Sequence, residues 1–176
     1  GHRQIGLLNG PVRSISARQR EAVWRQVLAD HQLSPCCVLR GDWSAKSGYQ
    51  AMLTQLPDAL PQALLVANDE MALGAMRALH QHGVAIPADI SIVGYDDTAE
   101  SAWYQPPLTT VRQDLQQLGT HSVDRVLAEL RGEAVTSRIL EPVLVIRETT
   151  AVPASQDLDL SDLARQLQQI ARKLSG

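Results

Sequence analysis

Residues 63–71 read ALLVANDEM, and this segment holds the strongest structural signal in the chain. Five successive apolar residues are typical of a strand whose sheet is covered by helices on both faces. Asn68 then follows as a residue that can cap a helix, and Asp69 and Glu70 lie in the first turn, where acidic groups favour the helix dipole. The buried stripe of that helix is Met71, Ala72, Ala75, Met76 and Leu79, and Gly83 ends it. The segment therefore predicts a strand that leads directly into an amphipathic helix.

The same alternation of strand and helix continues in both directions along the chain. Further strands are expected at residues 5–8, 37–39, 90–94, 108–111 and 143–146. Further helices are expected from Ser14 or Ser16 to just before Pro35, at about 45–56 and at about 114–130. In the first of these helices an apolar stripe runs through Ala17, Arg20, Val23, Trp24, Val27, Leu28 and His31. The order predicts the α/β class: a Rossmann-like, mostly parallel sheet with helices on both faces.

Composition limits the classes of function. The 176 residues are 44% hydrophobic, which is enough for one ordinary core, and the net charge is −3. No run of Lys or Arg exceeds two residues, so this chain alone should not bind DNA. No apolar stretch approaches the ~20 residues of a membrane-spanning helix and no signal peptide opens the chain, so the cytoplasm is the expected compartment and no membrane partner is expected. Because the sequence begins Gly1-His2-Arg3 and enters a strand at once, we expect a fragment that lacks its amino-terminal part.

No catalytic, metal or cofactor centre is predicted. Residues 41–47, GDWSAKS, resemble a phosphate-binding loop, but Ala45 stands where the glycine before the lysine must let the backbone wrap phosphates. Cys36 and Cys37 are adjacent, so they cannot close a stabilising loop, and they are too few for a zinc site. The five histidines show no ligand spacing. A nucleotide-dependent enzyme therefore remains only a weak alternative, supported by the imperfect loop alone.

Polar residues follow three of the predicted strands, at Asn9-Gly10, Asn68 and Asp96-Asp97. In doubly wound sheets, ligands settle in the crevice outside the carboxyl ends of the strands. Asn68, Asp96 and the planar fork of Arg20 can together donate to and accept from neighbouring hydroxyls of a sugar, and Trp43 can supply a flat apolar wall. The alternatives are purely structural: a helix cap for Asn68, a turn for Asp96, a solvated position for Arg20 and a core aromatic for Trp43.

The end of the chain differs in character from the rest. Residues 151–157 are rich in Pro, Ala and Ser and read as a linker, and residues 158–176 read as one helix. Its apolar residues recur at intervals of three and four, at Leu160, Leu163, Leu167, Ile170 and Leu174. This narrow seam is typical of a coiled coil that joins copies of the chain. The alternative, a helix folded back on its own domain, is less favoured because the flanking positions are mostly Gln, Arg and Ser.

Several segments together resemble the LacI/GalR family of bacterial transcription regulators. They are residues 65–77 (LVANDEMALGAMR), 89–98 (DISIVGYDDT) and 106–110 (PPLTT), with GDWSA at 41–45 and the pattern Ser14-x-Ser16-Ala17-Arg18-x-Arg20. The leucine-heptad tail, which most members of the family lack, also fits. The resemblance covers essentially the whole chain.

The resemblance implies a periplasmic-binding-protein-like core of two α/β subdomains that clasp a sugar, with an amino-terminal helix-turn-helix that reads operator DNA. Residues 1–150 then correspond to part of this core, mostly its carboxyl-terminal subdomain, and residues 108–148 cross to the amino-terminal subdomain. The helix-turn-helix, the hinge helix and the first half of the core are absent from this sequence.

The resemblance also assigns ligand-binding residues. Arg20, Asn68 and Asp96 would bond the hydroxyls of a galactoside such as allolactose, and Trp43 would stack on its apolar face. Ser14 and Ser16 would line the cleft, and Leu115 and Leu118 would form part of its apolar wall. The family member that this chain resembles most has phenylalanine where Leu115 stands, so part of the apolar wall near Leu115 and Leu118 is altered and the effector preference is expected to change with it.

The function implied is sensing rather than catalysis. Sugar binding would shift a conformational equilibrium and weaken operator binding in a repressor of galactoside use, and the heptad tail would join two dimers into a tetramer. The chain alone is expected to bind sugar weakly or undetectably and not to bind operator DNA. The main alternative is a sugar-binding transport receptor of the same fold, which would have no use for the heptad tail.

Overall fold

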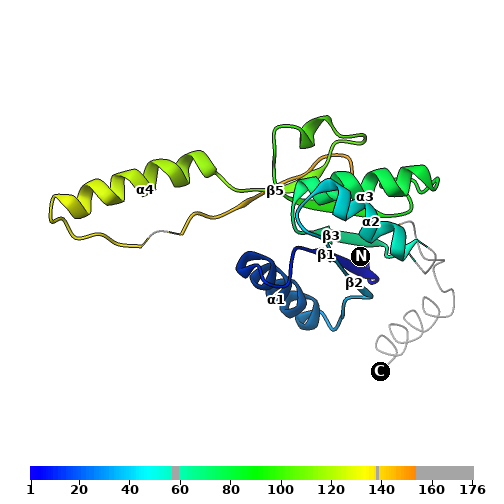
Figure 1. Ribbon diagram of the computed structural model, residues 1–176. Coiled ribbons are helices and arrows are strands. Elements are labelled where there is room, and N and C mark those ends of the chain that lie inside the picture. The colour runs from blue at the N-terminus through cyan, green and yellow to red at the C-terminus, as the bar shows by residue number, and fades with distance from the viewer. Residues whose placement is uncertain (57–59, 138, 154–176) are drawn as a thin grey trace, which may run out of the picture.

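The computed structural model describes residues 1–56, 60–137 and 139–153. Its strands are β1 (Ile5–Asn9), β2 (Cys37–Arg40), β3 (Ala63–Val66), β4 (Ser91–Asp96), β5 (Thr109–Arg112) and β6 (Val143–Val145). Its helices are α1 (Ile15–Asp30), α2 (Ala45–Gln55), α3 (Asp69–Gln81), the 3-10 helix η1 (Ser101–Trp103) and α4 (Leu115–Leu130) (Figure 1). Each strand and helix predicted within the described residues is present, and the ends are shifted by at most two residues, except that α1 ends at Asp30 and not just before Pro35.

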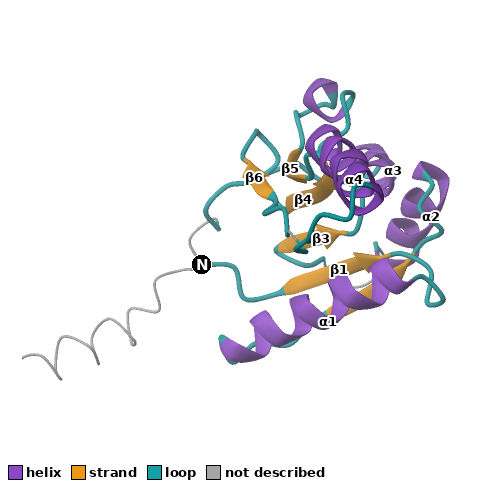
Figure 2. Ribbon diagram, turned by 90° about the vertical axis from the view of Figure 1, so that its left-hand side faces the viewer, coloured by secondary structure: helices purple, strands orange, loops and turns teal. Residues whose placement is uncertain are grey.

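The six strands form one sheet in the order β2-β1-β3-β4-β5-β6. The first five are parallel, and β6 pairs antiparallel with β5. Helix α1 lies on one face of the sheet, and α2 and α3 lie on the other (Figures 1 and 2). This arrangement confirms the predicted α/β sheet with helices on both faces.

The main core lies between the sheet and the pair α2 and α3, and it includes the fully buried Leu8, Leu64 and Met71. Two glycines let these helices meet backbone to backbone. A Cβ atom at Gly74 would lie 1.8 Å from the carbonyl oxygen of Ala45, and one at Gly48 would lie 2.1 Å from that of Met71. Any larger residue at either position would therefore force the two helices apart.

Helix α1 departs from the prediction of one continuous buried stripe. Only Ala17 and Leu28 are buried, and the side chains of Val23 and Val27 are 61% and 51% exposed. Beside the second half of the helix lies a hollow of about 480 Å³, which is lined by Trp24, Val27, Leu28 and Leu65 among others. The stripe is apolar, but in this chain the sheet covers only part of it.

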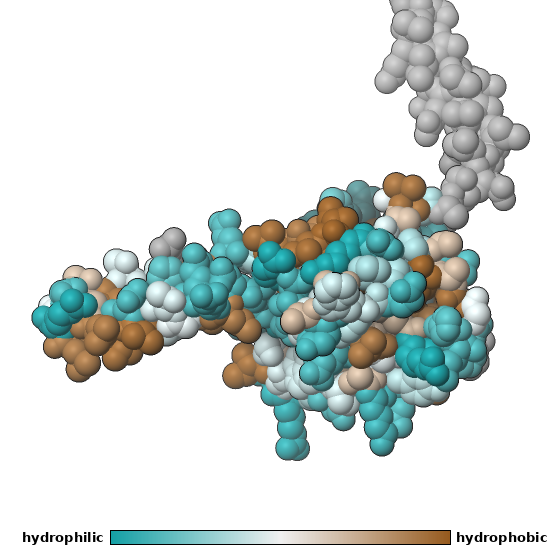
Figure 3. All heavy atoms as spheres, turned by 90° about the horizontal axis from the view of Figure 1, so that it is seen from above, coloured by the Kyte–Doolittle hydropathy of each residue, from teal (hydrophilic) through white to brown (hydrophobic). Residues whose placement is uncertain are grey.

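Residues 113–137 and 139–142, here called the arm, project away from the sheet (Figure 1). Helix α4 occupies the first part of the arm and has no buried residue. Brown, apolar atoms gather on the arm in Figure 3. The exposed apolar residues of α4 are Leu115, Leu118, Val123, Val126, Leu127 and Leu130. Such an apolar stripe is typical of a helix that packs against another body.

The remaining predictions about the chain end concern residues that lie largely outside the described part. Residues 151–153 are irregular, as expected for a linker, whereas the rest of the linker and the predicted oligomerisation helix fall at 154–176. In the part of the chain that the structure describes, no helix combines the length and apolar character needed to cross a bilayer. Cys36 and Cys37 are both free thiols.

Candidate functional site

Two of the three predicted polar positions, Asn68 and Asp96, lie at the carboxyl ends of neighbouring parallel strands. Strands β1, β3 and β4 lie side by side in register, so the segments that follow them emerge at one edge of the sheet. Asn68 directly precedes α3, and Asp96 is the last residue of β4. Their convergence, expected from the sequence, is confirmed by the topology.

Arg20 lies at the centre of this edge. Its Cζ atom is 3.8 Å from the centroid of the Tyr95 ring and 5.8 Å from that of Trp43. Its guanidinium donates to the carbonyl oxygen of Ala67, and Nη2 lies 3.7 Å from Asp96 Oδ1. The side chain is only 17% exposed, so Arg20 is not the solvated helix residue of the structural alternative. A guanidinium held by aromatic faces and a carboxylate is oriented to donate in a fixed direction.

Trp43 lies at the same edge, in the loop before α2, where its ring packs against Gly10, the residue after β1. A Cβ atom at Gly10 would lie 2.4 Å from the Trp43 ring, so only glycine leaves room for the indole. Trp43 itself has a φ of 80°, a left-handed conformation that is unfavourable for a bulky residue. Strain of this kind is typical of functional sites and persists only where the surroundings fix it.

Asn68 serves two structural purposes at once. Its Oδ1 accepts from the backbone N–H of Met71 at 3.0 Å and so caps α3, as the structural alternative proposed. Its Nδ2 donates to the carbonyl oxygen of Trp43 at 2.9 Å, which fixes the strained loop. The amide still has one N–H available, since each Asn offers two. A helix cap and a ligand contact are therefore compatible at this residue.

Asp96 faces Arg20 from the end of β4 and accepts from Gln113 Nε2 at 2.7 Å. Burial raises the pKa of Asp96 above its ordinary value, although the Arg20 charge and the Gln113 hydrogen bond act in the opposite direction. The backbone is strained here as well, with φ of 113° at Asp96 and 55° at Asp97. Asp96 is thus more than a simple turn residue, because several groups hold its carboxylate in place.

Ser14 and Ser16 lie at the start of α1. Ser14 caps the helix by accepting from the N–H of Ala17, and its Oγ lies 3.0 Å from Ser16 Oγ. Ser16 is one helical turn before Arg20, so both side chains lie on the same face of α1. Ser16 is exposed. The two hydroxyls therefore border the site without a described contact to Asp96 or Trp43.

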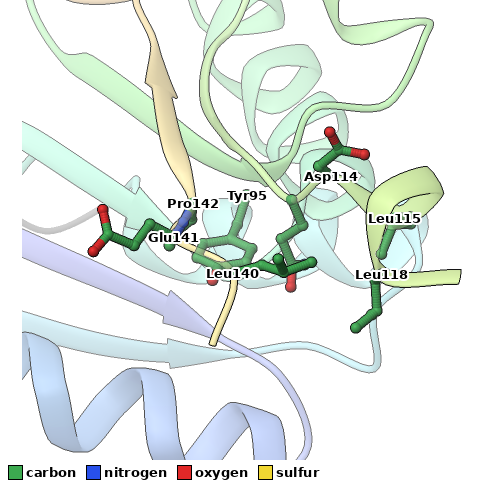
Figure 4. A pocket seen from close by; sticks show the side chains of 8 residues that line it. Tyr95, Asp114, Leu115, Leu118, Leu140, Glu141 and Pro142 are labelled. Carbon is green, nitrogen blue, oxygen red and sulfur yellow. The ribbon is translucent and has the colours of Figure 1, made fainter. Parts of the chain in front are cut away.

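Leu115 and Leu118 lie on α4 of the arm and face a hollow that Tyr95 also lines (Figure 4). They are 63% and 51% exposed and line a hollow of about 230 Å³ together with Tyr95 and Gln113. The far side of this hollow is formed by Leu140, Glu141 and Pro142. Tyr95 therefore lies between Arg20, which contacts its ring, and the hollow that contains Leu115 and Leu118, which Tyr95 also lines.

Sequence reasoning missed Tyr95 and Gln113, and it placed Asn9 at the site, where the structure does not put its amide. Tyr95 immediately precedes Asp96, and Gln113 immediately precedes the cap of α4, so position beside a strand end was the available signal. Asn9 is fully buried, and its Nδ2 donates to Ala17 O at 3.0 Å and to Glu21 Oε2 at 2.9 Å. The amide of Asn9 thus anchors α1 instead of facing the site.

The loop at 41–47 is a plain helix start. Asp42 accepts from the N–H and hydroxyl of Ser44, and Ser44 caps α2 by accepting from Ser47 N. The hydrogen bonds from Ser44 lower the pKa of Asp42 to about 2, so the loop before α2 carries a carboxylate. No cluster of three metal-ligating side chains is present among the described residues.

The arrangement has the groups that recognise a polyhydroxylated molecule. It combines an oriented guanidinium, a carboxylate and an amide with two aromatic faces, which suits alternating hydroxyl and apolar surfaces of a sugar. The fold and this site together define a doubly wound α/β domain with a candidate ligand-binding site at the carboxyl ends of its strands.

The comparisons agree with this class. Residues 1–150 match the family model of the periplasmic binding protein-like domain, and the chain belongs to that family. It is homologous to the lactose operon repressor of Escherichia coli (strain K12), being 50% identical over 177 residues, and it has the effector-binding core fold of the LacI/GalR family. That match covers 99% of this chain and 49% of the relative, so the chain spans about half the length of this relative.

Solved structures give the same result. A dimeric Lac repressor with an 11-residue carboxyl-terminal deletion has a TM-score of 0.84 and 51% identity, covering 87% of this chain and 57% of that one. A Lac repressor bound to ONPG in the repressed state has a TM-score of 0.82 and 51% identity, covering 85% of this chain and 46% of that one. These homologues favour a repressor over a transport receptor, and they are transcriptional regulators rather than enzymes.

Proposed function

We propose that this chain is the effector-binding part of a transcriptional repressor that responds to a galactoside. The observation that carries the proposal is Arg20, held between Tyr95 and Trp43 and facing Asp96 at the carboxyl end of β4. Arg20, Asn68 and Asp96 would bond the sugar hydroxyls, and Trp43 would stack on its apolar face. Ser14 and Ser16 would border the cleft, with Leu115 and Leu118 as its apolar wall.

The activity is a binding equilibrium that is coupled to DNA binding. A sugar that fits one arrangement of the two lobes better than the other shifts the population toward it, and this coupling is reciprocal with operator affinity. The operator would be read by an amino-terminal helix-turn-helix of the whole protein, which would work in the cytoplasm, where its operator is located. The exposed apolar stripe of α4 supports the assignment of residues 108–148 to the second lobe.

The heptad pattern at Leu160, Leu163, Leu167, Ile170 and Leu174 extends the proposal to assembly. Two dimers joined by these residues would form a tetramer, which can hold two operators at once. Tethering the second DNA contact raises its effective concentration without any new contact.

A two-lobed chimaera tests the sugar site directly. The amino-terminal half of the E. coli lactose operon repressor, joined to this chain, should bind ONPG in isothermal titration calorimetry. Arg20→Ala and Asp96→Asn should each weaken ONPG binding at least about ten-fold, because loss of a buried charged hydrogen-bond partner costs about 1.5–3 kcal/mol. Lys46→Ala is the matched control, since Lys46 is an exposed cation in the loop of the nucleotide alternative.

The outcomes separate the readings. A folded chimaera that does not bind ONPG, or that binds it equally well with Arg20→Ala, contradicts the galactoside site. Binding of a magnesium nucleotide that is abolished by Lys46→Ala would instead revive the enzyme alternative. Circular dichroism on each variant confirms that the fold is intact.

A further inference from the structure

Asp97, next to the proposed ligand-binding Asp96, forms ion pairs with two arginines. Its Oδ2 lies 2.5 Å from Arg112 Nε, and its Oδ1 lies 2.5 Å from Arg147 Nη2. The carboxylate is only 6% exposed, and burial opposes its ionisation. The hydrogen bonds and charges of the two arginines outweigh that penalty and lower the pKa of Asp97 below its ordinary value. Asp97 is therefore a buried anion at neutral pH.

The two arginines flank the pair of strands that carries the arm. Arg112 is the last residue of β5, from which the chain leaves for the arm, and Arg147 lies two residues after β6, the strand that receives the chain from the arm at Val143. Arg147 is itself fixed, because its Nη1 donates to Leu108 O at 2.7 Å and to Ser101 Oγ at 3.2 Å. One carboxylate thus ties the end of β5 to the segment that follows β6, and these two strands carry the arm.

The backbone around Asp97 is set by a second buried carboxylate. Asp69 Oδ2 accepts from the N–H of Thr98 at 2.9 Å, and Asp69 Oδ1 accepts from Thr110 Oγ1 at 2.6 Å. These bonds connect α3, the segment after β4 and β5. They help to maintain the positive φ angles of Asp96 and Asp97, which are unfavourable without such support.

We infer that Asp97 is a positioning residue that holds the arm against the strand bearing Asp96, so that Leu115 and Leu118 face the sugar site. The role of these leucines in binding rests on the proposed function, whereas the attachment of the arm does not. Gln113, the first residue of the arm, donates to Asp96 at 2.7 Å. The residue proposed to contact the ligand, Asp96, is therefore adjacent in sequence to Asp97, the residue that attaches the arm. The charge-assisted hydrogen bonds from Arg112 and Arg147 to Asp97 have fixed geometry, so they restrict the orientation of the arm relative to the sheet.

The experiment measures the orientation of the arm in the 176-residue chain without any ligand. In a Cys36→Ser, Cys37→Ser background, nitroxide labels are placed at the exposed positions His80→Cys on α3 and Asp124→Cys on α4. The doubly labelled chain is mixed with an excess of unlabelled chain, so that label pairs within one chain dominate, and double electron-electron resonance should then give one narrow distance distribution. Asp97→Asn, which keeps the size and removes the charge, should broaden it, and Asp97→Glu should restore part of the narrow distribution.

Two further variants guard against a general loss of structure. Arg112→Gln combined with Arg147→Gln leaves Asp97 in place and should broaden the distribution in the same way. Glu129→Gln removes the Arg125 ion pair, which lies wholly within α4, and should leave the distribution unchanged. Circular dichroism should show the same helix content in all of these proteins.

Unchanged distance distributions in both Asp97→Asn and the double arginine variant would overturn the inference. So would a broad distribution in the unmodified chain that none of the substitutions alters. Failure of the ONPG titration with the chimaera would instead count against the proposed function, and the distance measurement would stand independently of it.

Discussion

The guanidinium of Arg20 stacks on the ring of Tyr95, with 3.8 Å between Cζ and the ring centroid. The two residues come from α1 and β4, so the contact joins the helix on one face of the sheet to the end of a central strand. Tyr95 also lines the hollow that contains Leu115 and Leu118. Its ring therefore orients the main cation of the site and forms part of the apolar wall.

Replacement of Tyr95 tests this contact. Tyr95→Leu keeps an apolar side chain but removes the aromatic face, and cation-π contacts contribute about 0.5–2 kcal/mol. We expect the affinity of the chimaera for ONPG to fall by about 2- to 30-fold. Tyr95→Phe is the control and should bind as the unmodified protein does in the same calorimetric titration. Equal losses in Leu and Phe variants would assign the effect to the hydroxyl and contradict the stacking role.

Two substitutions of Asn68 can distinguish its role as the cap of α3 from its proposed role as a ligand contact. Asn68→Ala should lower the free energy of unfolding by about 0.5–2 kcal/mol through loss of the cap. Asn68→Asp retains an oxygen for the Met71 N–H, so the cap of α3 should be preserved, but it cannot donate to Trp43 O or to a sugar. Urea denaturation should therefore distinguish the two variants, whereas calorimetry should show weakened ONPG binding in both. Normal ONPG affinity in Asn68→Asp would mean that Asn68 is a cap alone.

Gly74 provides a test of the packing between α2 and α3. Gly74→Ala places a methyl group 1.8 Å from Ala45 O, so the helices must separate. Overpacking typically costs about 1–3 kcal/mol, and a clash with backbone lies at the upper end or beyond. The matched control is Gly119→Ala in α4, where no atom lies within 4 Å and the better helix propensity of alanine should raise stability by up to about 1 kcal/mol. Urea unfolding of both variants measures the difference, and a neutral Gly74→Ala would contradict the described helix contact.

Asp69 predicts a dependence of stability on pH. It is fully buried, and this burial raises its pKa even though Thr110 and Thr98 donate hydrogen bonds to it. As the pH rises from the ordinary aspartate pKa of about 3.9 toward the raised value, the unfolded chain releases this proton first, so the free energy of unfolding falls. The stabilisation is complete below the ordinary pKa and is lost as the pH passes the raised one.

The measurement for Asp69 is a series of urea midpoints between acidic and neutral pH. Because Asp96 also has a raised pKa, the quantity to compare is the difference between the unmodified chain and Asp69→Asn. The variant should gain stability relative to the unmodified chain as the pH increases through this window. A difference that does not vary with pH would show that Asp69 titrates normally.

Features that depend on neighbouring residues in the sequence could be predicted, whereas features that depend on distant residues could not. Strands and helices were predictable because caps, turns and apolar runs are local, as with Asn68 before α3 and Asp114 before α4. The convergence of Asn68 and Asp96 was predictable because parallel strands share one edge. These inferences required no knowledge of side-chain partners.

Side-chain partners were the part that the sequence could not provide. Whether Val23 is covered depends on how far α1 extends over the sheet, and the amide of Asn9 binds α1 because Glu21 and Ala17 O lie within reach. The stacking of Arg20 on Tyr95 joins residues 75 positions apart in sequence, so no local pattern contains it. The apolar stripe of α4 is visible in the sequence, but its exposure depends on what lies beside it.

The heptad tail gives the final prediction. The five residues Leu160, Leu163, Leu167, Ile170 and Leu174 form a seam too narrow for a helix docked on its own domain, and an isolated helix of this length is marginal in water. We therefore expect sedimentation equilibrium to show that the 176-residue chain self-associates. A version that ends at Gln156 should form particles of fewer chains. A Leu167→Ala variant should shift the equilibrium toward the smaller species, whereas Gln166→Ala, outside the seam, should not. If the full and truncated chains sediment as the same monomer, the heptads do not mediate assembly and the tetramer proposal fails.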